Sequence, residues 1–140
     1  MPPVKFGKKE CCTKSLVANG AIVNGRVEDS VISPGVYIEE GVLVKNSIIL
    51  NNCTIRKNAM INKTIIDKNV EIKENVQIGS GSDFTVNSDA KTTLENGLNL
   101  IAKDITIAKN IKINRNCRIN RNINIDESEN NEVKSGTTVD

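Results

Sequence analysis

Hydrophobic residues recur along this chain in pairs two residues apart, and the pairs return every six residues. The pattern is clearest between residues 30 and 80, where one 17-residue unit occurs three times, over 30–46, 47–63 and 64–80. A spacing of two is typical of a short strand, because alternate side chains of a strand share one face. Gly or Asn precedes most pairs, and these residues adopt left-handed backbone conformations at the lowest cost. Each hexad therefore predicts a strand followed by a corner.

Three hexads, with one residue removed, form about one triangular coil. The sequence therefore predicts an all-β fold, a left-handed parallel β-helix that stacks one coil on the next at about 4.8 Å. Its left-handed connections would be an exception to the right-handed rule for parallel strands. Inward side chains should form vertical ladders on the three faces, namely Val31, Ile48 and Ile65, then Val36, Cys53 and Val70, and then Val42, Ala59 and Val76.

Changes in the period divide the chain into segments. Residues 1–14 lack hexads and are expected to be an extended lead-in, 15–80 the first four coils, and 81–96 a long loop rich in Gly, Ser, Asp and Thr. The hexads resume over 97–125 as the final coils. The polar residues 126–140 are expected to cap the open strand edge or to remain disordered.

One face of the predicted β-helix carries an apolar stripe. If the ladders above are correct, the residues between the inward pairs of the first face point to solvent, and after the loop the equivalent positions become polar. A continuous apolar patch on one half of one face is typical of an interface. The alternative is the ordinary β-propensity of exposed Val and Ile. The residues predicted to form this interface are Val17, Ile32, Ile49 and Ile66.

Composition and charge narrow the classes of function that the chain could have. The 140 residues carry a formal net charge of +2 with interspersed signs, which does not favour nucleic acid or an anionic membrane as a partner. No signal-like start or long apolar run is present, so a cytoplasmic protein is expected.

Cys53 and Cys117 are expected to point inward as small apolar residues. Cys11 and Cys12 lack a second pair at zinc-binding spacing, so no metal site is predicted.

The sequence contains no histidine. Acyltransferases built from hexapeptide repeats generally use a histidine as the base, and no other side chain here titrates near neutrality. No phosphate-binding loop and no pairing of a nucleophile with a base is present. We therefore predict no catalytic residue in this chain.

Four segments resemble the C-terminal β-helix domain of glucose-1-phosphate adenylyltransferase, also called ADP-glucose pyrophosphorylase. PPVKF (2–6) is similar to the segment that leads into that domain. Residues 15–50 resemble its opening coils, residues 65–79 (IIDKNVEIKENVQIG) the coil that follows, and residues 96–107 (NGLNLIAKDITI) a late strand. The resemblance covers nearly the whole chain.

This resemblance implies a parent enzyme that joins ATP and glucose 1-phosphate into ADP-glucose and pyrophosphate, with Mg²⁺, for glycogen or starch synthesis. Catalysis would lie in an N-terminal domain absent from this chain, so the chain itself would need no cofactor. In the family the β-helix packs on the catalytic domain, takes part in tetramer assembly and contributes to the site for anionic phosphorylated effectors. Lys103 matches a lysine that binds such an activator in plant-type members, and Lys112 and Arg118 could add charge. The alternative for Lys103 is a solvated corner residue.

The hypothesis is thus an assembly and regulatory domain of a homo- or hetero-oligomeric sugar-nucleotide pyrophosphorylase. A free-standing hexapeptide scaffold is one alternative. A domain of another sugar nucleotidyltransferase, or of an acyltransferase, is the other.

Overall fold

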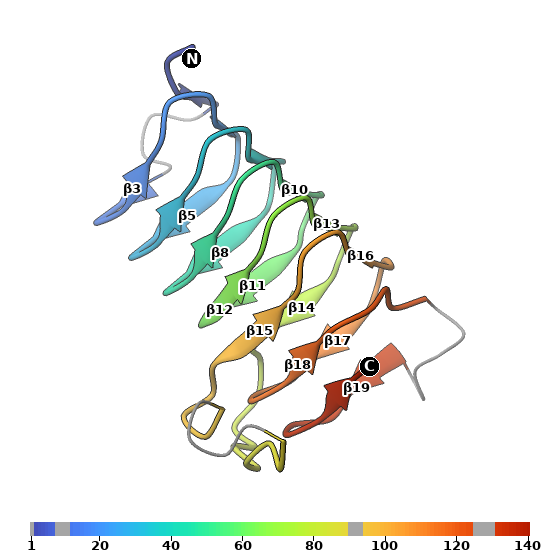
Figure 1. Cartoon of the computed structure of the whole chain (residues 1–140). Coiled ribbons are helices and arrows are strands. Elements are labelled where there is room, and N and C mark those ends of the chain that lie inside the picture. The colour runs from blue at the N-terminus through green and yellow to red at the C-terminus, as the bar shows by residue number, and fades with distance from the viewer. Residues whose placement is uncertain (1, 8–11, 90–93, 125–130) are drawn as a thin grey trace.

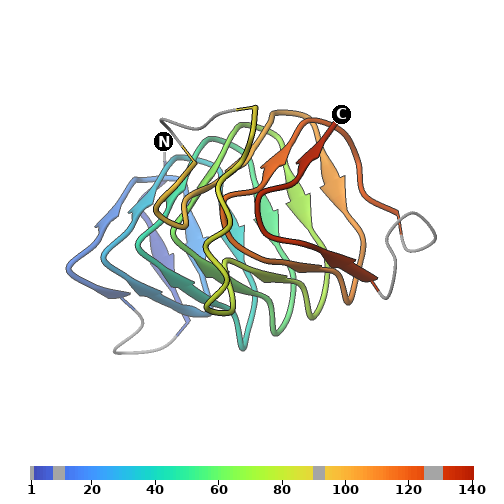
Figure 2. The ribbon, with the colours of Figure 1, turned by 90° about the horizontal axis from the view of Figure 1, so that it is seen from below.

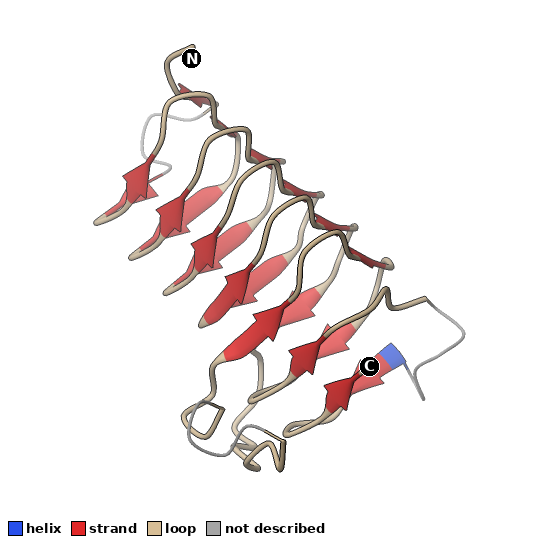
Figure 3. Cartoon of the chain, in the orientation of Figure 1, coloured by secondary structure: helices blue, strands red, loops and turns tan. Residues whose placement is uncertain are grey.

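The chain forms three parallel β-sheets that are the sides of a triangular prism. The computed structural model describes residues 2–7, 12–89, 94–124 and 131–140, and these residues contain twenty short strands and no α-helix. Figures 1 and 3 show the strands stacked coil upon coil, and the short helical segment drawn before β19 in Figure 3 is the single 3₁₀ residue Asn131. The chain passes from sheet to sheet and closes about seven coils. This is the predicted left-handed parallel β-helix built from hexapeptide repeats.

Each sheet takes one strand from each successive coil. Sheet A contains β1 (Lys5–Phe6), β4 (Ile22–Val23), β7 (Tyr37–Ile38), β10 (Thr54–Ile55), β13 (Glu71–Ile72) and β16 (Thr106–Ile107). Sheet B contains β2 (Cys12–Thr13), β5 (Arg26–Glu28), β8 (Leu43–Lys45), β11 (Met60–Asn62), β14 (Gln77–Ile78), β17 (Lys112–Ile113) and β19 (Glu132–Val133). Sheet C contains β3 (Leu16–Val17), β6 (Val31–Ile32), β9 (Ile48–Ile49), β12 (Thr64–Ile66), β15 (Asn99–Ile101), β18 (Arg118–Ile119) and β20 (Thr138–Val139).

The 17-residue unit sets the register between coils. Tyr37 pairs with Thr54 and Thr54 with Glu71, all in parallel, so equivalent residues lie 17 apart. The corners are left-handed as predicted, with φ of 61° at Asn52 and 58° at Asn69. Asn fits these corners because its short polar side chain tolerates the left-handed region.

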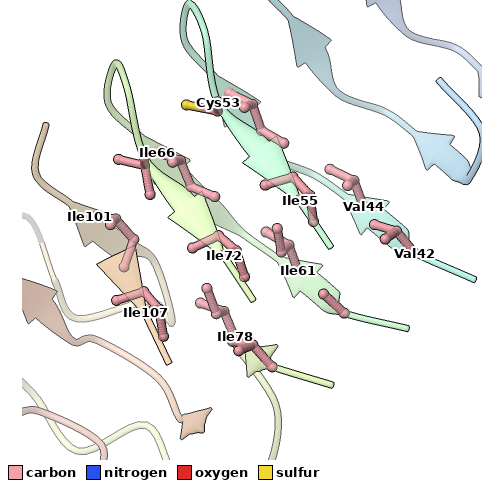
Figure 4. Packing of buried hydrophobic residues seen from close by; sticks show 14 of the residues in the cluster. Val42, Val44, Cys53, Ile55, Ile61, Ile66, Ile72, Ile78, Ile101 and Ile107 are labelled. Carbon is pink, nitrogen blue, oxygen red and sulfur yellow. The ribbon is translucent and has the colours of Figure 1, made fainter. Parts of the chain in front are cut away.

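The core is a set of vertical ladders of aliphatic side chains. The predicted ladders on sheets A and B are confirmed, and the second inward residue of each strand extends them (Figure 4). Because each inward side chain touches its equivalents one coil above and below, the core is continuous along the prism. Its buried members on these two faces include Val36, Cys53, Val70, Val42, Ala59, Val76, Ile38, Ile55, Ile72, Val44, Ile61 and Ile78.

The prediction for sheet C is wrong by one residue. Ile32, Ile49 and Ile66 are fully buried and Val17 is half-buried, so the predicted stripe faces the core rather than solvent. The predicted inward ladder instead faces out, since Val31 and Ile48 are exposed. A shift of one residue exchanges the two faces of a strand, because side chains alternate with a period of two.

A ladder of buried hydroxyl groups explains the error. The inward partner of Ile49 is Ser47, and the Ser47 Oγ donates to the Lys45 carbonyl at 2.6 Å and accepts from the Thr64 backbone N–H at 3.2 Å. Ser30 Oγ likewise donates to the Glu28 carbonyl and accepts from the Ser47 N–H. Fully hydrogen-bonded hydroxyls are tolerated in a core. A search for apolar pairs skips these positions and selects the outward Val and Ile beside them.

Strand pairing also continues into both segments that we expected to lie outside the coils. β1 and β2 pair with β4 and β5, and β19 and β20 pair with β17 and β18. Irregular coil lengths hide most of these strands in the sequence, because Cys12 of β2 pairs with Val27 at a spacing of 15 residues and Glu132 of β19 with Lys112 at a spacing of 20. Residues 126–130 of the predicted tail lie outside the described residues.

Candidate functional site

An apolar stripe does run along the outer face of sheet C, on residues other than those predicted. It consists of the outward side chain from each of five successive strands, which are in register. Leu16 is 73% exposed and Ile48 is 39% exposed, whereas the last two members are half-buried. Exposure is therefore greatest at the N-terminal coils. The members of this stripe are Leu16, Val31, Ile48, Ile65 and Leu100.

The stripe ends in a depression that is lined in part by charged side chains. In the next strand the outward residue is Arg118, which pairs with Leu100 and is exposed. An open depression of about 270 Å³ lies here, with aliphatic side chains flanked by a carboxylate and a guanidinium group. It is lined by Leu50, Ile65, Asp67, Leu100, Ile101, Ala102, Arg118 and Asn120.

The loop after β14 is fastened to the last two coils by two buried asparagines. Asn87 donates from Nδ2 to the Asn116 carbonyl at 3.1 Å and to Thr138 Oγ1 at 3.0 Å. Asn116 donates from Nδ2 to the carbonyls of Phe84 and Thr85 and accepts at Oδ1 from the Gly97 N–H at 2.7 Å. In Figures 1 and 2 the loop accordingly lies alongside the C-terminal coils.

Two apolar side chains of this clamped loop remain in solvent. Phe84 is 46% exposed and Val86 is 44% exposed. The Arg115 guanidinium lies 5.0 Å from the centroid of the Phe84 ring and Arg115 Nε donates to the Gly81 carbonyl. The loop thus presents an aromatic ring on an ordered base.

The predicted basic residues do not form one cluster. Lys103 is exposed at the corner between β15 and β16, next to the left-handed Asp104. Lys112 faces out from sheet B and Arg118 from sheet C, so they belong to different sides of the prism. A role for Lys103 in effector binding stays a prediction.

Comparison with known proteins places this architecture in a family. A family model described as GlmU-like, C-terminal hexapeptide matches residues 2–101. The chain belongs to this family. Among curated proteins the comparison finds no match.

The GlmU-like hexapeptide fold is also seen in a solved structure. The acetyltransferase domain of PglB from Neisseria gonorrhoeae FA1090 superposes with a TM-score of 0.56 at 16% sequence identity. The match covers 97% of this chain and 53% of that chain, so this chain spans about half the length of the solved structure. This likeness shows the shared fold.

The two buried thiols of this hexapeptide domain are poorly placed to act as nucleophiles. Burial raises the pKa of the Cys53 and Cys117 thiols to about 11, so both are protonated at neutral pH and are poor nucleophiles. Cys12 is half-buried on β2, and Cys11 lies outside the described residues. Among the described residues no group of three metal-ligating side chains occurs, and no helix there is long and apolar enough to cross a membrane.

The site therefore consists of two exposed apolar features, the stripe and the Phe84 loop. The sequence prediction found a stripe on the correct face and missed its members. The recurrence of Ser or Thr at positions 30, 47 and 64 is the signal that could have corrected the register. No periodic signal marks Phe84 and Val86, because the loop has no period.

Proposed function

We propose that this chain is the assembly and regulatory domain of a larger sugar nucleotidyltransferase of the glucose-1-phosphate adenylyltransferase kind. The observation that supports this proposal is the apolar stripe, whose three most exposed members, Leu16, Val31 and Ile48, lie in the N-terminal coils. A preceding domain would meet these coils first. The family description as a C-terminal domain and the resemblance of residues 15–50 to that enzyme agree with this arrangement.

In this proposal ATP, Mg²⁺ and glucose 1-phosphate bind to the preceding domain. The role of the present chain is to cover apolar surface of that domain with Leu16, Val31 and Ile48. Burying apolar area contributes about 25 cal/mol per Å², so three aliphatic side chains contribute several kcal/mol to such an interface. Lys103 would supply a positive charge for an anionic phosphorylated effector.

The test uses the longer protein encoded in frame with this chain and two matched variants. Ile48→Lys places a charge in the stripe. Met60→Lys places the same charge at a residue of similar exposure, 42%, on sheet B. We expect the wild type to form ADP-glucose, and Ile48→Lys to expose the junction between the domains to limited proteolysis at least about tenfold faster than Met60→Lys.

Three results would contradict the proposal. The first is that no nucleotidyltransferase domain precedes the chain, which favours the free-standing scaffold. The second is equal proteolysis of the two variants. The third is acetyl-CoA binding by the chain, which favours the acyltransferase. In the same protein, Lys103→Gln should weaken activation by a sugar bisphosphate at least about tenfold relative to Lys109→Gln, and equal activation would remove Lys103 from the effector site.

A further inference from the structure

An asparagine that directly precedes a glycine can lose its side-chain amide without an enzyme. The backbone nitrogen of the glycine attacks the amide carbon of the asparagine, and glycine has no Cβ to obstruct this approach. Asparagine is thermolabile for this reason. The chain contains three such pairs, which begin at Asn19, Asn24 and Asn96. The fold decides which pair reacts, because the two atoms must come within about 3–3.5 Å in the correct orientation.

The pair that begins at Asn96 is held at both ends of its peptide bond. The Gly97 N–H donates to Asn116 Oδ1 at 2.7 Å, and Lys63 Nζ donates to the Asn96 carbonyl. Gly97 is also buried. Its nitrogen therefore cannot turn toward the Asn96 side chain without breaking both hydrogen bonds.

The pair that begins at Asn24 is held by the adjacent coil. The Asn24 N–H donates to the Ile38 carbonyl at 2.8 Å, and the Arg26 N–H donates to the Val42 carbonyl at 2.8 Å. Gly25 lies between them and is buried, and a Cβ at this position would lie 2.7 Å from the Val42 carbonyl oxygen. The backbone rotation that brings the Gly25 nitrogen to the Asn24 side chain has no room against this coil.

The pair that begins at Asn19 lies in an open turn. Asn19 is exposed at the corner between β3 and β4, where Gly20 has a φ of 89° and the Ala21 N–H donates to the Ala18 carbonyl at 3.3 Å. This is a type II β-turn, whose third residue has a positive φ. Among the described residues the Gly20 N–H donates to no carbonyl, and the Asn19 side chain forms no hydrogen bond. Both reacting groups are therefore free to meet.

We propose that Asn19 is a site of spontaneous deamidation in the folded chain. A bond forms between the Gly20 nitrogen and Cγ of Asn19, the Cγ–Nδ2 bond breaks, and the amide nitrogen leaves as ammonia with the proton of the Gly20 N–H. Water then opens the cyclic imide at either carbonyl, which yields aspartate or isoaspartate. Both products are carboxylates at neutral pH, so the corner gains a negative charge.

The added charge changes the N-terminal end of the stripe. Asn19 follows Leu16 by three residues, and Leu16 is the most exposed member of the stripe at 73%. Isoaspartate also lengthens the backbone of the turn by a methylene group. An effect on the contact with a preceding domain rests on the proposed function, whereas the reaction itself requires only this chain and water.

Peptide mapping by mass spectrometry tests the proposal on the chain alone. The folded chain and the chain unfolded in guanidinium chloride are incubated side by side until about half of each Asn–Gly pair in the unfolded chain has reacted. In the unfolded chain the three pairs should react at rates within about threefold of one another, because the fold no longer restrains them. In the folded chain Asn19 should gain about 1 Da at least about tenfold faster than Asn24 and Asn96, which are the matched internal controls.

Ion-exchange chromatography adds a measurement on the intact chain. The incubated wild type should show a new acidic species that Asn19→Gln lacks, and circular dichroism establishes that both samples stayed folded. An unmodified Asn19 in the folded chain would overturn the proposal, as would reaction of Asn24 or Asn96 at the same rate as Asn19. Equally fast formation of the acidic species in Asn19→Gln would place the reaction elsewhere and overturn it too.

Discussion

Two neighbouring isoleucines provide a sharp test of which side chains of sheet C face the core. Ile48 and Ile49 have the same side chain and share strand β9, yet Ile48 is 39% exposed and Ile49 is 0% exposed. Truncation of a fully buried Ile to Ala costs about 2–5 kcal/mol, from lost burial and the remaining cavity. Truncation of a surface residue changes stability by about 0.5 kcal/mol or less. Ile49→Ala should therefore be the less stable of the two variants by at least about 1.5 kcal/mol.

Lysine variants at the same two positions enlarge this contrast. In Ile48→Lys the new ammonium group would reach solvent, whereas in Ile49→Lys it would lie among Ile32, Ile66 and the hydroxyl ladder. An unpaired buried charge costs several kcal/mol in addition to the lost burial, which is comparable with the total stability of about 5–15 kcal/mol of a domain. We expect Ile48→Lys to fold and Ile49→Lys to be largely unfolded.

Urea unfolding followed by circular dichroism measures both pairs. Equal midpoints for Ile48→Ala and Ile49→Ala would refute a register in which Ile49 faces the core and Ile48 faces solvent. A folded Ile49→Lys together with an unfolded Ile48→Lys would restore the register predicted from the apolar pairs. The unfolding slope should be the same in both alanine variants, because they expose nearly the same surface on unfolding.

Two further predictions concern the buried polar groups of the core. Ser47 is 3% exposed and its hydroxyl accepts the Thr64 N–H, so Ser47→Ala should lower the free energy of unfolding by about 1–3 kcal/mol. Urea unfolding measures this change. An unchanged free energy of unfolding would show that the hydroxyl ladder does not stabilise the fold. Burial raises the pKa of the Cys53 and Cys117 thiols from the ordinary value of 9.0 to about 11. Their contribution to folding stability is therefore complete below pH 9 and is lost as the pH rises through 11, because the buried thiols must then ionise. The change in pKa from 9.0 to about 11 corresponds to about 2–3 kcal/mol of folding free energy for each thiol. A Cys53→Ala, Cys117→Ala double variant should therefore show a free energy of unfolding that depends less on pH between 9 and 11, as urea unfolding at several pH values would measure.

Most of the fold could be predicted from the sequence because corners and apolar pairs are both local signals. Asn52 and Asn69 mark corners by their own conformational preference, and Val70 with Ile72 marks a strand by spacing alone. On sheet C the inward position holds Ser47, whose burial depends on hydrogen bonds to another coil. Such a partner cannot be read from the type of a single residue, and one polar position in each repeat was enough to reverse the predicted face of the strand.

The candidate site was harder to predict for a similar reason. The stripe was placed on the correct side of the prism, but its members follow from the register of sheet C. The position of the Phe84 loop depends on the hydrogen bond that Asn87 donates to the Asn116 carbonyl. These two residues lie 29 positions apart, and no local sequence pattern encodes such a contact. The role of Lys103 depends on a ligand and on a domain outside this chain, so its chemistry stays a prediction.

The regular stacking of the coils fixes the distance between features that lie on different coils. The stripe is most exposed at the N-terminal coils, whereas the Phe84 loop is fastened near the C-terminal end. The distance between the two therefore grows by about 4.8 Å for every coil inserted between them, with no change in the chemistry of either. A related chain with one coil more or less could carry both features unchanged and present them at a different separation.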